Sequence, residues 1–225
     1  MSQPLKTVAI VCEGQTEVSF VQSILADYLS RHSVIVQPVI VKTATNLTGN
    51  RHRGGGGWTG RPGTGWEHLI SGLLHVPSYD IVTTLIDWYG FPANGPIIRD
   101  NKNATIDEVE AGMAEIFHND RFVPFIVLHE LETYVIAALA HNSSGKFARM
   151  QAAAAAWIRD AHGAEHINND PNRKPSQRLR DCWNQNDLQY VKTITPLDIF
   201  QTVPFDVVLE ECPRLQRWVT TLTGT

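Results

Sequence analysis

Carboxylate side chains follow three of the four apolar segments that we predict to be strands. Glu13, Asp87 and Glu130 each stand within two residues of the end of such a segment. Because ligands of an open parallel sheet bind beyond the carboxyl ends of its strands, we expect these side chains to lie at one edge. Carboxylates gathered in this way repel one another unless a cation neutralises them. Oxygen ligands select Mg²⁺ (or Mn²⁺), so the pattern predicts a site for metal-assisted phosphoryl transfer.

Three further residues near these positions could serve the same site. Glu132 follows Glu130 by two positions, so the two side chains cannot point the same way in an extended segment. In the first turn of a helix, one of them would bind the metal and the other would cap the helix. Glu17 falls in the first turn of the helix expected after Glu13, where it would either contact substrate or act as a cap. His129 would assist the acidic site, or be a structural histidine at the end of a strand.

The segments that position these residues alternate between strands and helices. Short apolar runs predict strands, and apolar residues at helical spacing predict the helices between them. The predicted strands are 5–12, 34–41, 80–86 and 122–128. Pro38 lies inside the second of these and indicates an edge strand or a bulge. The predicted helices are 16–31, 66–76, 106–117 and a segment that ends near residue 140. This alternation indicates an α/β fold with a Rossmann-like, largely parallel four-stranded sheet flanked by helices.

The pattern changes beyond residue 141, where helical segments replace the alternation. An alanine-rich helix is expected over 146–162, followed by a polar Asn/Pro stretch at 168–176 and further helices. We therefore expect an α/β core over residues 1–141. A helical C-terminal appendage over residues 142–225 would pack on this core.

The composition limits the classes of function. The chain has 225 residues, of which 43% are apolar, and a net charge of −4. This balance excludes a strongly basic protein that binds nucleic acid by charge alone, so a nucleic-acid substrate would require a local basic patch, a metal or a partner. Three cysteines without metal-ligand spacing, and no signal peptide, predict a reducing cytoplasmic compartment. No apolar run approaches the ~20 residues that cross a membrane, so we expect no membrane partner.

Two segments carry basic residues that could contact a phosphate backbone. The densest basic stretch comprises Arg173, Lys174, Arg178 and Arg180. It would grip phosphates beside the metal, or form the solvated start of a helix. The glycine-rich segment 46–65 contains Arg51, Arg53, Arg61 and Trp58, and Trp66 directly follows it. It would contact a nucleic-acid backbone and stack a base, or form a surface loop without a ligand.

The order of several motifs resembles a known family. The segment Glu13-Gly14-Gln15-Thr16-Glu17 resembles the E-G-x-T-E signature of a Toprim-related bacterial family of unknown function. That family is distantly similar to the overcoming-lysogenisation-defect nucleases. The segments that resemble its later blocks, in the same order, are 86–92, 128–132, 167–169 with 175–179, and 212–218. The resemblance spans nearly the whole chain and implies a Toprim-like fold.

The resemblance also implies roles for individual residues. In Toprim proteins a glutamate after the first strand acts as general acid or base, and an Asp-x-Asp motif after the third strand binds Mg²⁺. By position, Glu13 takes the first role and Asp87 takes the metal role. Tyr89 stands where the second aspartate is expected, and a phenol is a poor Mg²⁺ ligand at neutral pH. Either Glu130 or Glu132 then supplies the missing carboxylate, or catalysis is weak or absent.

We therefore expect a metal-dependent nuclease that acts on DNA or RNA. Arg178 would position the nucleic-acid backbone, and Lys192 is a substrate-binding candidate through the resemblance alone. The alternative is a non-catalytic Toprim-like binding or regulatory subunit that works with a partner ATPase in an anti-phage defence complex. A third reading is binding or hydrolysis of a small nucleotide. The sequence leaves the oligomeric state open.

Overall fold

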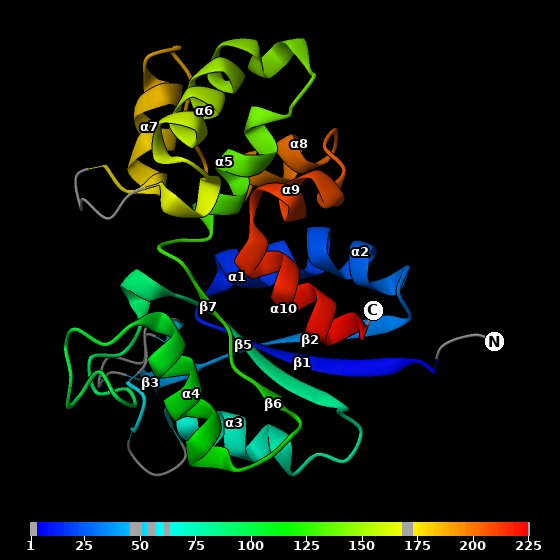
Figure 1. The fold of residues 1–225 in the computed structure, drawn as a ribbon, viewed down its shortest axis with the longest axis vertical. Coiled ribbons are helices and arrows are strands. Elements are labelled where there is room, and N and C mark those ends of the chain that lie inside the picture. Colours follow the sequence, from blue (N-terminus) through cyan, green and yellow to red (C-terminus); the bar gives the residue numbers. More distant parts are fainter. Residues whose placement is uncertain (1–3, 46–50, 54–56, 61–63, 168–172, 225) are drawn as a thin grey trace. The chain divides into compact units, whose positions relative to one another are not determined.

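The computed structural model describes residues 4–45, 51–53, 57–60, 64–167 and 173–224, with only the backbone course described for 42–45 and 51–53 (Figure 1). The chain divides into two compact units, Met1–Ile126 and Val127–Thr225, and each is described by itself. The division lies before the predicted boundary at residue 141. The reason is that helix α5 (Glu132–Ala140) contacts the helices that follow it, α6 to α9.

The first unit contains a largely parallel sheet, as predicted. The strands are β1 (Lys6–Cys12), β2 (Val34–Ile40), β5 (Ile81–Asp87), β6 (Phe122–Val123) and β7 (Ile126–Val127). Their order is β2-β1-β5-β6, and β7 also pairs with β5. Adjacent strands in this order are parallel, which confirms the α/β, Rossmann-like fold class.

The fourth predicted strand, 122–128, is two short strands in the structure. Pro124 separates them, because proline has no N–H to donate to the ladder. The buried hydroxyl of Thr84 on β5 replaces part of the missing pairing. Its Oγ1 accepts from the Phe125 N–H and lies within hydrogen-bonding distance of the Phe125 carbonyl, both at 2.8 Å. The sheet therefore has five strands rather than four.

Helices cover both sides of this sheet, with α1 and α2 on one side and α3 and α4 on the other (Figure 1). The predicted helix 16–31 is one helical segment with a wider π-helical turn inside it. Its parts are α1 (Gln15–Phe20), the π-helical turn (Val21–Leu25) and α2 (Ala26–Ser30). The other two helices are α3 (Trp66–Leu74) and α4 (Ile106–Phe117). Thr105 and Glu108 cap the start of α4, each accepting from the backbone N–H of the other.

The core of the first unit is built on β1 and β5. Residues 8–12 of β1 have no exposed surface, and the residues from Val82 to Ile86 are buried as well. Strands buried on both faces have near-continuous apolar runs, and this is why the strands were visible in the sequence. Burial of this apolar surface stabilises the sheet by roughly 25 cal/mol per Å².

Part of the glycine-rich segment forms a small second sheet. Strands β3 (Lys42–Thr45) and β4 (Arg51–Arg53) pair in antiparallel fashion. The prediction of a loop over 46–65 is therefore wrong for β4. The predicted nucleic-acid contacts of Arg51, Arg53 and Arg61 lie outside the described side chains.

The second unit is helical, as predicted for the C-terminal part of the chain. Its helices are α5, α6 (Ala148–Ala161), α7 (Pro175–Asn184), α8 (Thr195–Phe200), α9 (Phe205–Glu211) and α10 (Pro213–Thr223), with short 3₁₀ turns at Gly145–Phe147 and Ala164–His166. Every residue of α5 from Glu132 to Leu139 is buried, which is typical of a central helix. Within the described ranges, no helix has the length and apolar character needed to cross a membrane.

Candidate functional site

Glu13 and Asp87 lie at the same edge of the sheet. Strands β1 and β5 are parallel neighbours, and Cys12 at the end of β1 pairs with Leu85 of β5. Strand β1 ends at Cys12 and β5 ends at Asp87, so Glu13 and Asp87 stand at neighbouring strand ends on the same edge of the sheet. Both residues are half-buried. The first and third predicted strands, which are β1 and β5, thus end in carboxylates at the same edge of the sheet, as predicted.

The carboxylate of Glu13 contacts the turn that Asp87 begins. This turn is a short 3₁₀ helix, Trp88–Gly90. A Cβ atom placed on Gly90 would lie 2.2 Å from Oε2 of Glu13 and 2.7 Å from its Oε1. Only a residue without a side chain leaves room for the Glu13 carboxylate here. The glycine at this position therefore allows the Glu13 carboxylate to lie directly against this turn.

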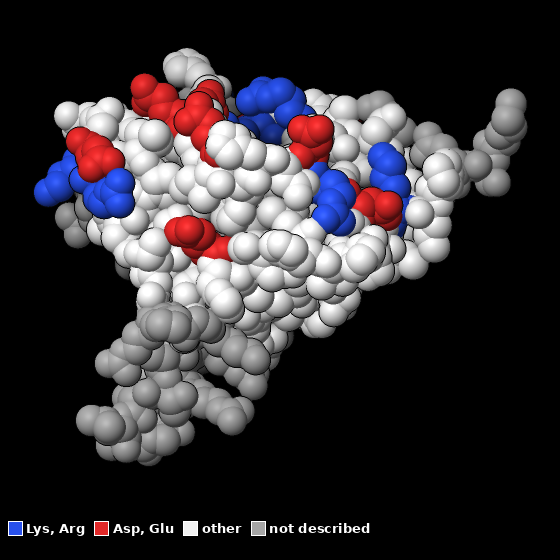
Figure 2. All heavy atoms as spheres, turned by 90° about the horizontal axis from the view of Figure 1, so that it is seen from below, with Lys and Arg blue, Asp and Glu red and all other residues white. Residues whose placement is uncertain are grey.

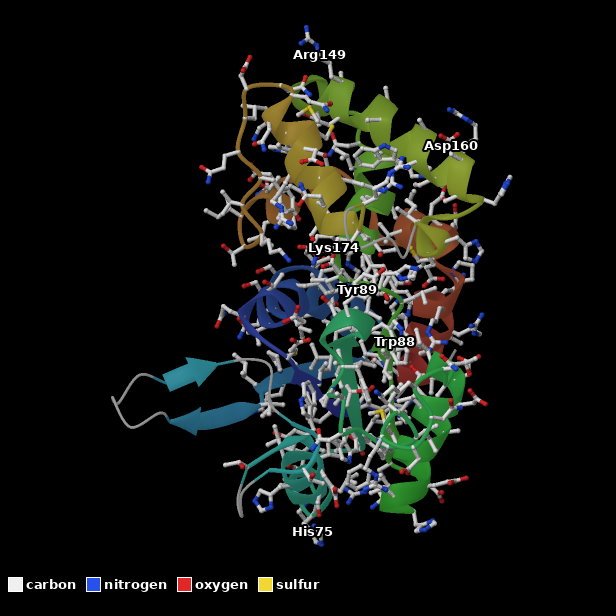
Figure 3. The ribbon with its side chains drawn as sticks, turned by 90° about the vertical axis from the view of Figure 1, so that its left-hand side faces the viewer. His75, Trp88, Tyr89, Arg149, Asp160 and Lys174 are labelled. Carbon is white, nitrogen blue, oxygen red and sulfur yellow. The ribbon has the colours of Figure 1, made fainter. Side chains whose placement is uncertain are left out.

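Two aromatic residues occupy the same turn. Figure 3 shows Trp88 and Tyr89 on the segment that follows β5. Tyr89 is 41% exposed, at the position where the family resemblance expects an aspartate. The ring of Trp88 lies 6.0 Å from that of Phe91, a distance typical of aromatic pairs. The turn thus presents a phenol to solvent beside Asp87.

Glu17 acts as a helix cap. Its Oε2 accepts a hydrogen bond from the Gly14 N–H at 2.8 Å, and the side chain is only 7% exposed. The positive end of the helix dipole also stabilises acidic side chains in the first turn of a helix. Burial raises the pKa of the Cys12 thiol, and the negative charge of Glu17 raises it further. The sequence indicated either a substrate contact or a helix cap for Glu17, and the observed hydrogen bond is that of a cap.

Glu130 is held by groups of the second unit. Its Oε2 accepts from the Ser176 N–H at 2.9 Å, and its Oε1 lies 3.0 Å from Nζ of Lys174. Lys174 stands just before α7, at its start in Figure 3, and Pro175 occupies the first turn. Burial raises the pKa of Glu130, but the Ser176 N–H and the Lys174 ammonium outweigh burial, so the pKa lies below its ordinary value.

Glu132 has a lysine partner as well. Its Oε1 lies 2.7 Å from Nζ of Lys192, and the Glu132 side chain is 3% exposed. The nearby phenol of Tyr190 is buried, and burial, with the charges of Glu132 and Glu130, raises the pKa of Tyr190. Both glutamates that sequence reasoning assigned to the metal are thus paired with lysines of their own unit. Sequence reasoning missed these partners, because they lie more than forty residues later in the chain.

A sequence profile of the family described as a domain of unknown function (DUF4276) matches residues 12–223. The chain belongs to the DUF4276 family. The matched region begins one residue before Glu13 and extends through α10, so it includes every candidate residue named above. No curated protein and no solved structure matches the chain. The family description names no activity, so function must be argued from the residues.

His129 of this DUF4276 chain has an unusual backbone conformation. Its φ is +75°, in the left-handed region, and its side chain is 7% exposed. Non-glycine residues with this conformation are uncommon, and they cluster at functional sites. Burial lowers the pKa of His129, while the negative charge of Glu130 opposes this effect and His166 adds to it. A neutral imidazole beside an ionised Glu130 is therefore favoured.

Arg178 is engaged within the second unit. Its Nε donates to the Arg173 carbonyl at 2.8 Å, and its guanidinium lies 5.7 Å from the centroid of the Trp157 ring. Such a cation–π contact stabilises by roughly 0.5–1 kcal/mol at partly exposed sites. The Asn168–Asn169 part of the family resemblance lies outside the described residues. The basic stretch is therefore partly occupied by local contacts.

The DUF4276 chain offers a small acidic site rather than a complete metal cage. Among the residues that the structure describes, no group of three or more His, Cys, Asp or Glu side chains is arranged to hold a metal ion. Glu13 and Asp87 form a smaller set of two carboxylates at neighbouring strand ends. On the face shown in Figure 2, acidic and basic side chains are interspersed on a largely uncharged surface. That face does not carry the broad basic patch typical of proteins that bind nucleic acid by charge.

Proposed function

We propose that this chain is a Toprim-like, metal-dependent phosphoryl-transfer protein, and specifically a nuclease that acts on DNA or RNA. The observation that carries the proposal is the contact between the Glu13 carboxylate and Gly90, in the turn that begins at Asp87. This contact places the Glu13 carboxylate, at the end of β1, against the turn that follows Asp87 at the end of β5. Two acidic groups at the carboxyl edge of a parallel sheet are suited to a ligand with phosphate groups and a divalent cation.

The carboxylates of Glu13 and Asp87 suit an Mg²⁺ ion that keeps part of its water shell. Mg²⁺ is commonly bound through one or two carboxylates and keeps waters for substrate phosphates, so Asp87, with the Glu13 carboxylate nearby, would suffice without a full protein cage. When bound, the ion would supply Lewis-acid stabilisation to a phosphoryl oxygen. Glu13 would hold or release the proton of the attacking or leaving oxygen, and Asp87 would serve as the metal ligand.

The remaining candidates have weaker support as ligands. Glu130 and Glu132 are each paired with a lysine, so the proposal rests on Glu13 and Asp87 first. Arg178 has uncharged partners, the Arg173 carbonyl and the Trp157 ring, so its charge would be available to a nucleic-acid backbone. Lys192 is paired with Glu132 and has weaker support. The same site would also accept a small nucleotide. Whether the substrate is a nucleic acid or a single nucleotide is therefore one outcome of the test.

A carboxylate at the opposite end of β5 provides a matched control. We expect Glu13→Gln and Asp87→Asn to abolish Mn²⁺-dependent cleavage of plasmid DNA and single-stranded RNA without unfolding the chain. Asp80→Asn removes the same charge from the other end of the strand, where Asp80 accepts from the Thr7 N–H at 2.7 Å. This control should cleave normally. Full activity in both Glu13→Gln and Asp87→Asn would refute the assignment.

A second function is favoured by a different observation. Tyr89 is exposed at the position of the expected second aspartate, which suits a non-catalytic binding or regulatory subunit. Such a subunit would act with a partner ATPase, in a complex of the anti-phage type. Wild-type protein that cleaves neither nucleic acid, and binds Mn²⁺ no more tightly than the Asp87→Asn variant in a calorimetric titration, would support this second function over the first.

A further inference from the structure

The first unit contains a cavity of about 580 Å³ whose lining residues do not include Glu13 or Asp87. Its volume falls within the roughly 300–1,000 Å³ that small-ligand sites occupy. The wall includes Trp58, residues 94–97, 99 and 100 of the segment that leads to α4, and part of α4 itself. No established or proposed role uses this cavity.

Hydrogen bonds of one side chain, that of Asn94, hold two parts of the cavity wall together. Oδ1 of Asn94 accepts from the Trp58 N–H at 2.9 Å, and its Nδ2 donates to the Thr59 carbonyl at 3.2 Å and hydroxyl at 3.1 Å. A single side chain therefore joins two loops that are more than thirty residues apart in the sequence. Sites for small ligands are usually preformed in this way.

Ile97 fixes the same wall against α4. Its φ is +63°, a left-handed conformation that a β-branched residue rarely adopts. A Cβ on Gly112 of α4 would lie 2.5 Å from Cγ1 of Ile97, so the isoleucine packs directly on the helix backbone. Strained positions of this kind persist where surrounding contacts enforce them, often at ligand sites.

The charges around the cavity favour a cation. Glu67 of α3 and Glu115 of α4 have no ion-pair partner among the described residues. The guanidinium of Arg99 is already 3.2 Å from the carboxylate of Asp100. Lining carboxylates thus outnumber lining guanidinium groups, and an anionic ligand such as a nucleotide would be repelled.

Trp58 adds an independent sign of a ligand. Its side chain is 2% exposed, and no described residue accepts a hydrogen bond from its Nε1. A buried donor without an acceptor costs about 1–3 kcal/mol. An acceptor on a bound ligand would satisfy this donor.

We propose that this cavity binds a guanidinium or ammonium group carried on an aliphatic stem, with Glu67 and Glu115 as its counter-charges. The stem packs on the apolar wall around Ile97, and a neighbouring carbonyl accepts from the Trp58 Nε1–H. This chemistry occurs in free amines and in the arginine or lysine side chain of a peptide. The proposal does not depend on phosphoryl transfer at Glu13 and Asp87.

Calorimetric titration of the full chain tests the proposal. N-acetyl-arginine amide should bind, and N-acetyl-citrulline amide, its neutral isostere, should bind at least about tenfold more weakly, since a charge-assisted hydrogen bond is lost. Glu67→Gln and Glu115→Gln should each weaken binding of the arginine compound. Glu210→Gln removes an exposed carboxylate of α9 that does not line the cavity, and should leave binding unchanged.

Two ligands distinguish the sources of the cation. Agmatine, which has no carbonyl, represents a free amine, and the capped peptide Gly-Arg-Gly represents a protein partner. Trp58→Phe removes the indole donor. It should weaken binding of the peptide and leave binding of agmatine unchanged. If this buried substitution unfolds the chain by circular dichroism, the two glutamine variants still decide the question. Equal binding of the citrulline compound, tighter binding of guanosine monophosphate, or no binding of any cation at millimolar concentration would overturn the proposal.

Discussion

The carboxylate of Glu13 lies directly against the backbone of Gly90, so closely that a methyl group on Gly90 would lie 2.2 Å from Oε2 of Glu13. The contact joins the first residue after β1 to the turn after β5. Because the atom in the way is the far end of a flexible side chain, a larger residue at position 90 would displace the carboxylate and leave the fold intact. The site can therefore be perturbed without touching an acidic residue.

Gly90→Ala should separate the effect on the site from the effect on stability. We expect metal-dependent cleavage to fall on the order of 10- to 100-fold, since a shift of about 1 Å at a reacting group costs this much. The free energy of unfolding should change by less than about 1 kcal/mol. Cleavage rates and urea denaturation measure the two quantities. Unchanged cleavage in this variant would count against a role for the Glu13 carboxylate.

Gly72→Ala is the matched glycine substitution. Gly72 lies within α3, and a Cβ there would meet nothing within 4 Å. Alanine should therefore stabilise the chain by roughly 0.5–1 kcal/mol, because it lowers the conformational entropy of the unfolded state. A rise in the urea midpoint with unchanged cleavage is the expected result, and a fall would show that α3 has a close neighbour at this position.

Tyr89→Asp should strengthen metal binding. The substitution places a third carboxylate on the turn beside Asp87, where Tyr89 is now exposed. We expect the affinity for Mn²⁺ to rise about tenfold, equivalent to ~1.4 kcal/mol. Tyr89→Asn has nearly the same shape without the charge and is the control. Equal Mn²⁺ affinity in the two variants would argue that no metal binds near this turn.

Glu130 should make the stability of the second unit depend on acid pH. Its pKa is lower in the folded than in the unfolded chain, because the Ser176 N–H and Lys174 hold the ionised form against the cost of burial. The resulting stabilisation is present above the unfolded pKa of ~4.3 and is lost as the pH falls through the folded pKa.

The Glu130→Gln variant tests this pH dependence. It should lose roughly 1.5–3 kcal/mol of stability at pH 7, the usual contribution of hydrogen bonds to a charged group. Its unfolding free energy should also vary less with pH between 5 and 3 than that of the wild-type chain, as measured by denaturation at each pH. The same slope in both proteins would assign the acid sensitivity to another group.

The acidic edge was predictable because its signals are local. Short, mostly apolar runs mark β1 and β5, and the carboxylates stand at the ends of these runs: Glu13 directly follows β1, and Asp87 is the last residue of β5. Parallel pairing of the two strands then follows from the helical crossover between them. The division of the fourth strand was missed, although Pro124 was present in the sequence to indicate it.

Contacts between distant segments were not predictable in the same way. The lysine partners of Glu130 and Glu132 come from positions 174 and 192, and no periodic pattern links a glutamate to a lysine that far away. The same applies to Asn94 and Trp58, whose hydrogen bond closes one wall of the cavity. Such pairs depend on how loops are arranged, and loop conformation has weaker sequence signals than strands and helices do.

Pro38 has a consequence for how the protein behaves at high concentration. Strand β2 is the edge of the order β2-β1-β5-β6, and Pro38 lies within it, paired with Ile10 of β1. An edge strand is a template for another chain, and proline interrupts that template because it has no N–H to donate outward. Ile35, on the same strand, is 50% exposed. Pro38 therefore protects the chain against aggregation through this edge.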